Sequence, residues 1–249
     1  MANKQKSVED IKAFCFDVFG TVVDWREGIT RDARVFLARM GRPDIDPHAF
    51  ADAWRARYQP AMAACREGRR PYTRLDVLHR ENLLDVLSSY EIDPDSVPEH
   101  ELEWLNGAWH RLDPWPDVVQ GLGYLKLRYI IAPASNGNIS LMVDLARRSG
   151  FPWDAILGAD VSRAYKPHPD AYHALPEALG LRPEEVCMTA AHNDDLVAAR
   201  ECGLATAFVP RRMEHGAMQK TDLHAEDDWD LIADDFIDLA KQAGCYPQL

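Results

Sequence analysis

Residues 13–24 read Ala-Phe-Cys-Phe-Asp-Val-Phe-Gly-Thr-Val-Val-Asp, and this stretch decides the fold. The apolar run over residues 11–16 predicts a short buried strand that ends on Asp17, and Gly20-Thr21 then turns the chain sharply. Ligands of open parallel sheets bind at the carboxyl ends of the strands. A carboxylate is costly to bury there unless another group pairs with it or uses it. We therefore expect Asp17 either to act as a nucleophile or only to cap the following loop.

The composition is that of an ordinary globular protein. Of the 249 residues, 47% are hydrophobic and 27% are charged, and the net charge is -12. The chain has no basic stripe and no stretch near the ~18 apolar residues of a membrane span, so we expect neither a nucleic-acid partner nor a membrane. The 5 cysteines lie far apart without a Cys-x-x-Cys pair, which favours a reducing, cytoplasmic location over disulfides or a zinc site.

The periodicity of the apolar residues changes along the chain. Up to residue 114, after the first strand, these residues recur at helical spacing and are punctuated by proline and glycine. Later, apolar strands at 129–134, 155–157, 186–189 and 205–209 alternate with helices at 138–149, 167–180 and 194–203. This alternation predicts an α/β fold with a parallel sheet covered on both faces. We expect a core of residues 1–21 and 115–249, and an inserted helical cap over residues 22–114 that excludes water from the site.

Polar side chains also follow two later segments of the predicted core. Ser135 and Asn136 come directly after strand 129–134 and open a helix, where backbone N–H groups attract anions, although helix capping alone also explains them. Lys166 precedes Pro167, which keeps it out of helical geometry and suits a side chain that reaches from a loop. A lysine near Asp17 would keep that carboxylate ionised.

Four segments occur in the order of the core motifs of the haloacid dehalogenase superfamily, which the sequence resembles over about residues 10–240: Asp17 to Asp24, Ser135-Asn136, Lys166-Pro167 and Ala190 to Asp195. The resemblance implies a Rossmann-like core with a helical cap. Phosphatases of the superfamily carry a second aspartate two residues after the nucleophile and a metal-binding aspartate in the fourth motif. Phe19 and Ala191 stand at these places here, and neither side chain offers the oxygen that magnesium requires. The motifs thus favour a leaving group that needs no proton, such as a halide.

Within the superfamily the sequence resembles the L-2-haloacid dehalogenases. This implies hydrolysis of short (S)-2-haloacids through an aspartyl ester, with inversion to 2-hydroxy acids. It implies small 2-haloacids and water as partners, no metal, no organic cofactor, and often a homodimer. The resemblance assigns catalytic roles to Asp17, Thr21, Lys166, Asp195 and His192, and substrate or halide contacts to Arg55, Ser135, Asn136, Phe19 and Tyr172.

Three questions stay open at this point. His192 stands where these dehalogenases commonly carry asparagine, so it either activates water or only hydrogen-bonds. A magnesium-dependent phosphatase or phosphonatase, and a non-catalytic small-acid binding protein on the same scaffold, are the alternative functions. Asp17 and Lys166 argue against the binding protein. The motifs do not determine the preferred halogen or the chain length of the acid.

Overall fold

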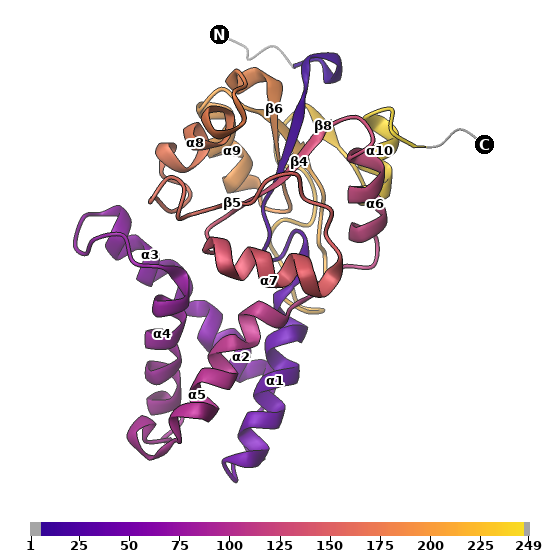
Figure 1. Ribbon diagram of the computed structural model, residues 1–249. Helices are drawn as coiled ribbons and strands as arrows, with labels where there is room; N and C mark the ends of the chain where they lie inside the picture. Colours follow the sequence, from indigo (N-terminus) through magenta and orange to yellow (C-terminus); the bar gives the residue numbers. More distant parts are fainter. Residues whose placement is uncertain (1–5, 247–249) are drawn as a thin grey trace.

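A parallel sheet forms the centre of the molecule (Figure 1), whose computed structural model describes residues 6–246. Its 6 strands lie in the order β5-β4-β1-β6-β7-β8, each parallel to its neighbour. The strands are β1 (Ala13–Phe16), β4 (Ile130–Ser135), β5 (Leu157–Gly158), β6 (Val186–Ala190), β7 (Ala205–Phe208) and β8 (Leu231–Ile232). The α/β fold predicted from the sequence is confirmed, and β1 lies inside the sheet, between β4 and β6.

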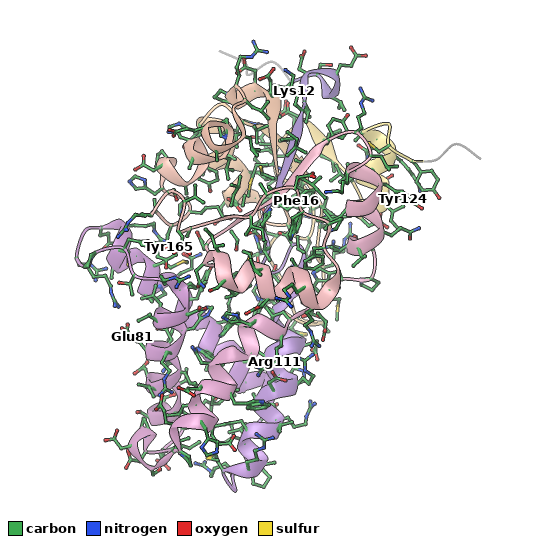
Figure 2. All side chains as sticks on the ribbon, viewed as in Figure 1. Lys12, Phe16, Glu81, Arg111, Tyr124 and Tyr165 are labelled. Carbon is green, nitrogen blue, oxygen red and sulfur yellow. The ribbon has the colours of Figure 1, made fainter. Side chains whose placement is uncertain are left out.

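Alternate side chains of β1 belong to two separate apolar cores. Phe14 and Phe16 pack on one face with α6 (Val118–Leu125) and α10 (Phe236–Gln242), and Ala13 and Cys15 face the other side. That second core includes side chains of α8 (Pro169–Leu179) and α9 (Asn193–Glu201). Figure 1 shows these two pairs of helices on opposite sides of the sheet, and Figure 2 shows Phe16 among the side chains of the core. Because side chains of a strand alternate with period two, a strand buried on both faces must be apolar throughout, as β1 is.

A second group of helices extends away from the sheet (Figure 1). These helices are α1 (Trp25–Arg39), α2 (Pro47–Ala56), α3 (Tyr58–Arg66), α4 (Leu75–Ser89) and α5 (Glu99–Asn106). The chain enters these helices through β2 (Val23–Asp24) and returns to the sheet through β3 (Asp113–Pro114). The two strands pair antiparallel. Within residues 6–246, every helix is too short or too polar to cross a membrane.

The observed elements differ from the predicted ones mainly at their ends. The predicted helix 138–149 is α7 (Ile139–Ser149), and the strand expected at 155–157 begins only at Leu157. The helix expected over 167–180 begins at Pro169 and ends before Gly180, which adopts a left-handed φ of 66°. The ribbon β2–β3, the edge strand β8 and the helix α10 were not predicted.

A buried ion pair ties the loop after β7 to the turn after β1. Arg211 donates from Nε to the Thr21 carbonyl at 2.9 Å, and its two terminal nitrogens donate to the Asp117 carboxylate at 2.8 and 2.9 Å. Asp117 also accepts the backbone N–H of Phe236 at the start of α10, at 2.9 Å. Burial opposes ionisation of Asp117, but the hydrogen bonds from Arg211 hold its pKa below the ordinary value. The pair thereby joins α6, α10 and the two loops.

We expect Asp117→Asn to lower the free energy of unfolding by about 3–5 kcal/mol at pH 7, because it leaves the Arg211 charge buried without its counter-ion. The side chains of Arg211 and Asp117 are only 7% and 12% exposed. Urea denaturation measures the loss. As the folded-state pKa of Asp117 is lowered, its contribution is present above the unfolded pKa of about 3.9 and is lost as the pH falls through the folded value. The difference in free energy of unfolding between wild type and variant therefore becomes smaller at acidic pH.

Glu81→Gln is the matched control for this prediction. Arg70 also binds the Glu81 carboxylate through both terminal nitrogens, at 2.7 and 3.1 Å, but on the outside of α4 (Figure 2). An exposed pair of this kind contributes about 0–1 kcal/mol. Equal losses in the two variants would contradict the role given to the buried pair.

Candidate active site

The ammonium group of Lys166 lies between two buried carboxylates at the C-terminal edge of the sheet. Asp17 follows β1 directly, and Lys166 Nζ donates to its Oδ1 at 2.9 Å. The same Nζ donates to Oδ2 of Asp195, in the first turn of α9. The three side chains are 9–11% exposed, so each charge depends on the others for compensation. The structure thus brings together the predicted nucleophile, the predicted lysine and the acid of the fourth motif.

The charges fix the protonation states of this triad. Burial raises the pKa of Asp17, but Lys166 and His192 outweigh it and hold the pKa well below its ordinary value. Burial lowers the pKa of Lys166, and the two carboxylates more than reverse this, so that the pKa lies above its ordinary value. Burial and the nearby Asp17 raise the pKa of Asp195 in spite of Lys166. At neutral pH, Asp17 is a carboxylate and Lys166 an ammonium.

Three predicted residues hold this triad in place. The hydroxyl of Thr21 donates to Asp17 Oδ2 at 2.7 Å and accepts the backbone N–H of Ala191 at 2.9 Å. The hydroxyl of Tyr172, on α8, donates to Asp195 Oδ1 at 2.6 Å. Asn136, after β4, accepts the backbone N–H of Lys166 at 2.8 Å through Oδ1, which leaves its NH₂ group as a further donor.

His192 connects Asp17 to a buried carboxylate that the motifs did not indicate. Its Nδ1 lies 3.2 Å from Asp17 Oδ2, and its Nε2 lies 2.8 Å from Oε2 of Glu214. Glu214 Oε1 also accepts the indole N–H of Trp25 at 2.9 Å. Burial lowers the pKa of His192, yet Glu214 and Asp17 raise it well above its ordinary value, so the ring is an imidazolium. No motif surrounds Glu214 in the loop after β7; only its position in the fold identifies it.

A cavity of about 520 Å³ opens beside Asp17. Its lining includes Asp17, Phe19, Arg55, Tyr58, Asn136, Lys166, Tyr172, His192, Asp195 and Glu214. Arg55 comes from α2, and its guanidinium carbon lies 4.0 Å from the ring centre of Tyr58 and 5.2 Å from that of Trp25. Its buried Nη1 has no hydrogen-bond partner among residues 6–246. The cavity is therefore lined by an ionised carboxylate, an apolar ring and the cation of Arg55, whose buried Nη1 lacks an acceptor.

Ser135 and Thr21 are the predicted site residues outside the lining of this cavity, and Ser135 lines a smaller one together with Asn136 and Lys166. The Oγ of Ser135 accepts the backbone N–H of Gly137 at 3.0 Å. Asp194 lies in the first turn of α9, where a negative charge complements the helix dipole. Within residues 6–246, no group of 3 or more His, Cys, Asp or Glu side chains is arranged to hold a metal ion.

Comparisons with known proteins show the family to which the chain belongs. The family model described as haloacid dehalogenase-like hydrolase matches residues 11–203. The (S)-2-haloacid dehalogenase of Xanthobacter autotrophicus is 30% identical over 204 residues, which cover 81% of this chain and 76% of that protein. The chain therefore belongs to the haloacid dehalogenase-like hydrolase family, and the resemblance inferred from its motifs is confirmed.

Two solved structures are similar over nearly the whole chain. One, a defluorinating L-2-haloacid dehalogenase, has a TM-score of 0.92 and 51% identity, and the match covers 94% of this chain and 95% of that one. The other, an L-2-haloacid dehalogenase, has a TM-score of 0.89 and 43% identity. The match covers 95% of this chain and 100% of the dehalogenase chain.

Proposed function

We propose that the protein is an (S)-2-haloacid dehalogenase that converts short 2-haloalkanoic acids, haloacetates and fluoroacetate included, into 2-hydroxy acids. The observation that carries the proposal is the ionised Asp17 in a cavity where Arg55 offers an N–H without an acceptor. Phe19 stands where a phosphatase would need its proton donor, which disfavours a phosphate ester as substrate. The dehalogenases among the relatives support the same choice over a phosphatase or a non-catalytic binding protein.

The first step is a displacement at carbon. An oxygen of Asp17 attacks the carbon that bears the halogen from the side opposite the halogen. The new C–O bond forms as the C–halogen bond breaks, the halide leaves with the electron pair, and the carbon inverts. Arg55 and the NH₂ group of Asn136 stabilise the departing halide, because donors held in place act most strongly on charge that develops in the transition state. Phe19 supplies an apolar wall, and Lys166 and Thr21 keep Asp17 oriented.

The second step hydrolyses the ester. Alkylation removes the Asp17 charge, and His192 loses its Nδ1 proton to solvent. Water then attacks the carboxyl carbon of Asp17 and gives a proton to His192 while Lys166 and Asp195 hold the acyl group in place, and the bond from this carbon to the substrate oxygen breaks, so that the hydroxy acid leaves. Ser135 holds the substrate carboxylate, because its hydroxyl accepts the N–H of Gly137 and so keeps its O–H as a donor. The same hydrogen bond shapes the turn that presents Asn136.

We further propose that residues 22–114 act as a cap. Arg55 from this segment and Asp17 from the sheet line the same cavity, so movement of the cap would open the site to substrate and close it against water. A homodimer and a cytoplasmic location also remain proposals. The first rests on the family resemblance and the second on the free cysteines.

We expect Asp17→Asn to release no halide from any 2-haloacid because the amide is a poor nucleophile, and to keep the fold but lower its melting temperature, because Lys166 and His192 lose a buried counter-ion. Halide detection and thermal melting measure the two effects. A single turnover of the wild type in ¹⁸O water places label on Asp17 and leaves the product hydroxyl unlabelled. Direct labelling of the product would instead indicate attack of water on the substrate.

Arg55→Ala should lower kcat by about 10²–10³, the usual effect of removing one preorganised donor. The loss should be larger for fluoroacetate than for bromoacetate, because fluoride is the poorer leaving group. Arg55→Lys should recover only part of the rate, since an ammonium lacks the planar fork. Arg57→Ala is the control, because Arg57 lies outside the cavity lining and pairs with Asp85 on the surface. A rise in KM at unchanged kcat would make Arg55 a carboxylate anchor instead.

Activity on 2-haloacids should survive dialysis against EDTA, because Phe19 and Ala191 replace the oxygen ligands of the metal-dependent enzymes. Halide release before and after dialysis measures this, and p-nitrophenyl phosphate with added Mg²⁺ tests the phosphatase alternative in parallel. Loss of dehalogenation that Mg²⁺ restores, or rapid phosphate release, would contradict the argument from the missing ligands.

A further inference from the structure

Glu214 is a buried carboxylate for which the halide displacement has no use. Its side chain is 2% exposed, and it lies in the loop after β7. One oxygen accepts the indole N–H of Trp25 and the other meets Nε2 of His192. Burial opposes its ionisation, but His192 outweighs this, and the pKa of Glu214 stays below its ordinary value. A buried charge of this kind is costly unless its partners are fixed, so the surroundings of Glu214 must be built around it.

The turn after Asp17 makes room for this carboxylate. Gly20 has a φ of 95°, and a Cβ built on it would lie 2.2 Å from Oε1 of Glu214. Any side chain at position 20 would therefore displace the carboxylate, besides straining the backbone. The loop itself is anchored, because the N–H of Glu214 donates to the carbonyl of Arg211 at 3.1 Å, and Arg211 forms the buried pair with Asp117.

Four charged or titratable groups lie around the His192–Glu214 pair. Asp17 and Glu214 contact the two ring nitrogens of His192. Lys166 contacts the other oxygen of Asp17, Oδ1. Arg55 acts on Glu214 through its charge, as does His215, whose Nε2 lies 3.7 Å from Oε1. When Asp17 becomes an ester it loses its negative charge, and Glu214 is then the one carboxylate among these groups that still contacts His192.

We propose that Glu214 is the positioning residue that orients His192 as general base for hydrolysis of the Asp17 ester, an inference that rests on the proposed function. The acceptor at Nε2 fixes the tautomer in which Nδ1 faces Asp17 and can accept a proton. The negative charge stabilises the imidazolium that forms when water attacks, as the acid of a triad does for its histidine.

The protons balance over the cycle. Before alkylation, Nδ1 carries a proton that faces the Asp17 carboxylate. Alkylation removes that acceptor, and this proton passes to solvent through the cavity, which accounts for the one proton that the net reaction releases. Attacking water then gives a proton to Nδ1 as its oxygen bonds to the carboxyl carbon of Asp17. The bond from this carbon to the substrate oxygen breaks, the imidazolium protonates the departing alkoxide, and the new Asp17 acid returns its proton to Nδ1.

Glu214→Gln tests the proposal with little change of shape. The amide oxygen of glutamine can still accept from Trp25, but its NH₂ group cannot accept from His192. With 2-chloropropionate, the variant should release one halide per site at the wild-type rate and then turn over about 10²–10⁴ times more slowly. The ester should accumulate, visible by intact mass as the enzyme plus the substrate less hydrogen chloride. The acid limb of the single-turnover hydrolysis rate should move to lower pH, because the carboxylate that raises the pKa of His192 is gone.

Two comparisons separate this role from a structural one. His192→Asn should slow the same step, and Glu214→Gln added to it should cause no further loss, because the two residues act as a unit. Glu185→Gln is the matched control: Glu185 is also buried and paired, with Lys12 at the opposite end of β1 from Asp17 (Figure 2), so it should lose stability without accumulating ester.

The possible outcomes are distinct. The role of Glu214 would be overturned if Glu214→Gln turned over at the wild-type rate and accumulated no ester. It would also be overturned if the acid limb of the hydrolysis rate did not move and the rate losses of the two single variants added up in the double variant. If Glu214→Gln does not fold, Glu214→Asp replaces it, and wild-type hydrolysis by this shorter carboxylate would overturn the role equally. Failure of the wild type itself to release halide from any 2-haloacid would instead overturn the proposed function.

Discussion

The ammonium of Lys166 between Asp17 and Asp195 is the constraint on which the site depends. Three charges that are nine-tenths buried require one another, so the loops that carry them must meet with little tolerance. The parallel sheet supplies that precision, because β1 and β6 are neighbours and both end at this edge. Thr21 and Tyr172 add one hydrogen bond to each carboxylate, which supports the charge compensation by Lys166.

The parts of the fold and site that could be predicted have a local signal. A strand buried on both faces is apolar at every position, and the turn and charge at its end stand out, as at Asp17. Lys166 was indicated by the proline that follows it, and Asp195 by its place in the fourth motif. For Ser135 the local signal had two explanations, because a hydroxyl after a strand either binds a ligand or closes a turn. In the fold the hydroxyl closes the turn by accepting from Gly137 and keeps its O–H as a donor, so the two explanations are compatible.

The parts that could not be predicted depend on tertiary contacts. The strands β2, β3 and β8 are 2 residues long, too short for any alternation to show. Helix α10 is different, because its apolar residues Phe236, Leu239 and Ala240 recur at helical spacing, and this pattern does predict a helix. Glu214 has no such signal. Its role depends on Trp25 and His192, 189 and 22 residues away along the chain, and only folding brings these three together.

The arrangement also explains how one site can serve two successive steps. In the resting site, Asp17, Asp195 and Glu214 face Lys166, His192 and Arg55, so three negative charges oppose three positive ones. A substrate carboxylate adds a negative charge that stays in the ester, and the charge of Asp17 is the one that leaves with the halide. The ester then lacks the carboxylate that held the proton on Nδ1 of His192, and the pKa of the ring falls although Glu214 remains. In the proposed mechanism, formation of the intermediate therefore converts His192 from an imidazolium that orients Asp17 into the base that hydrolysis of the ester requires.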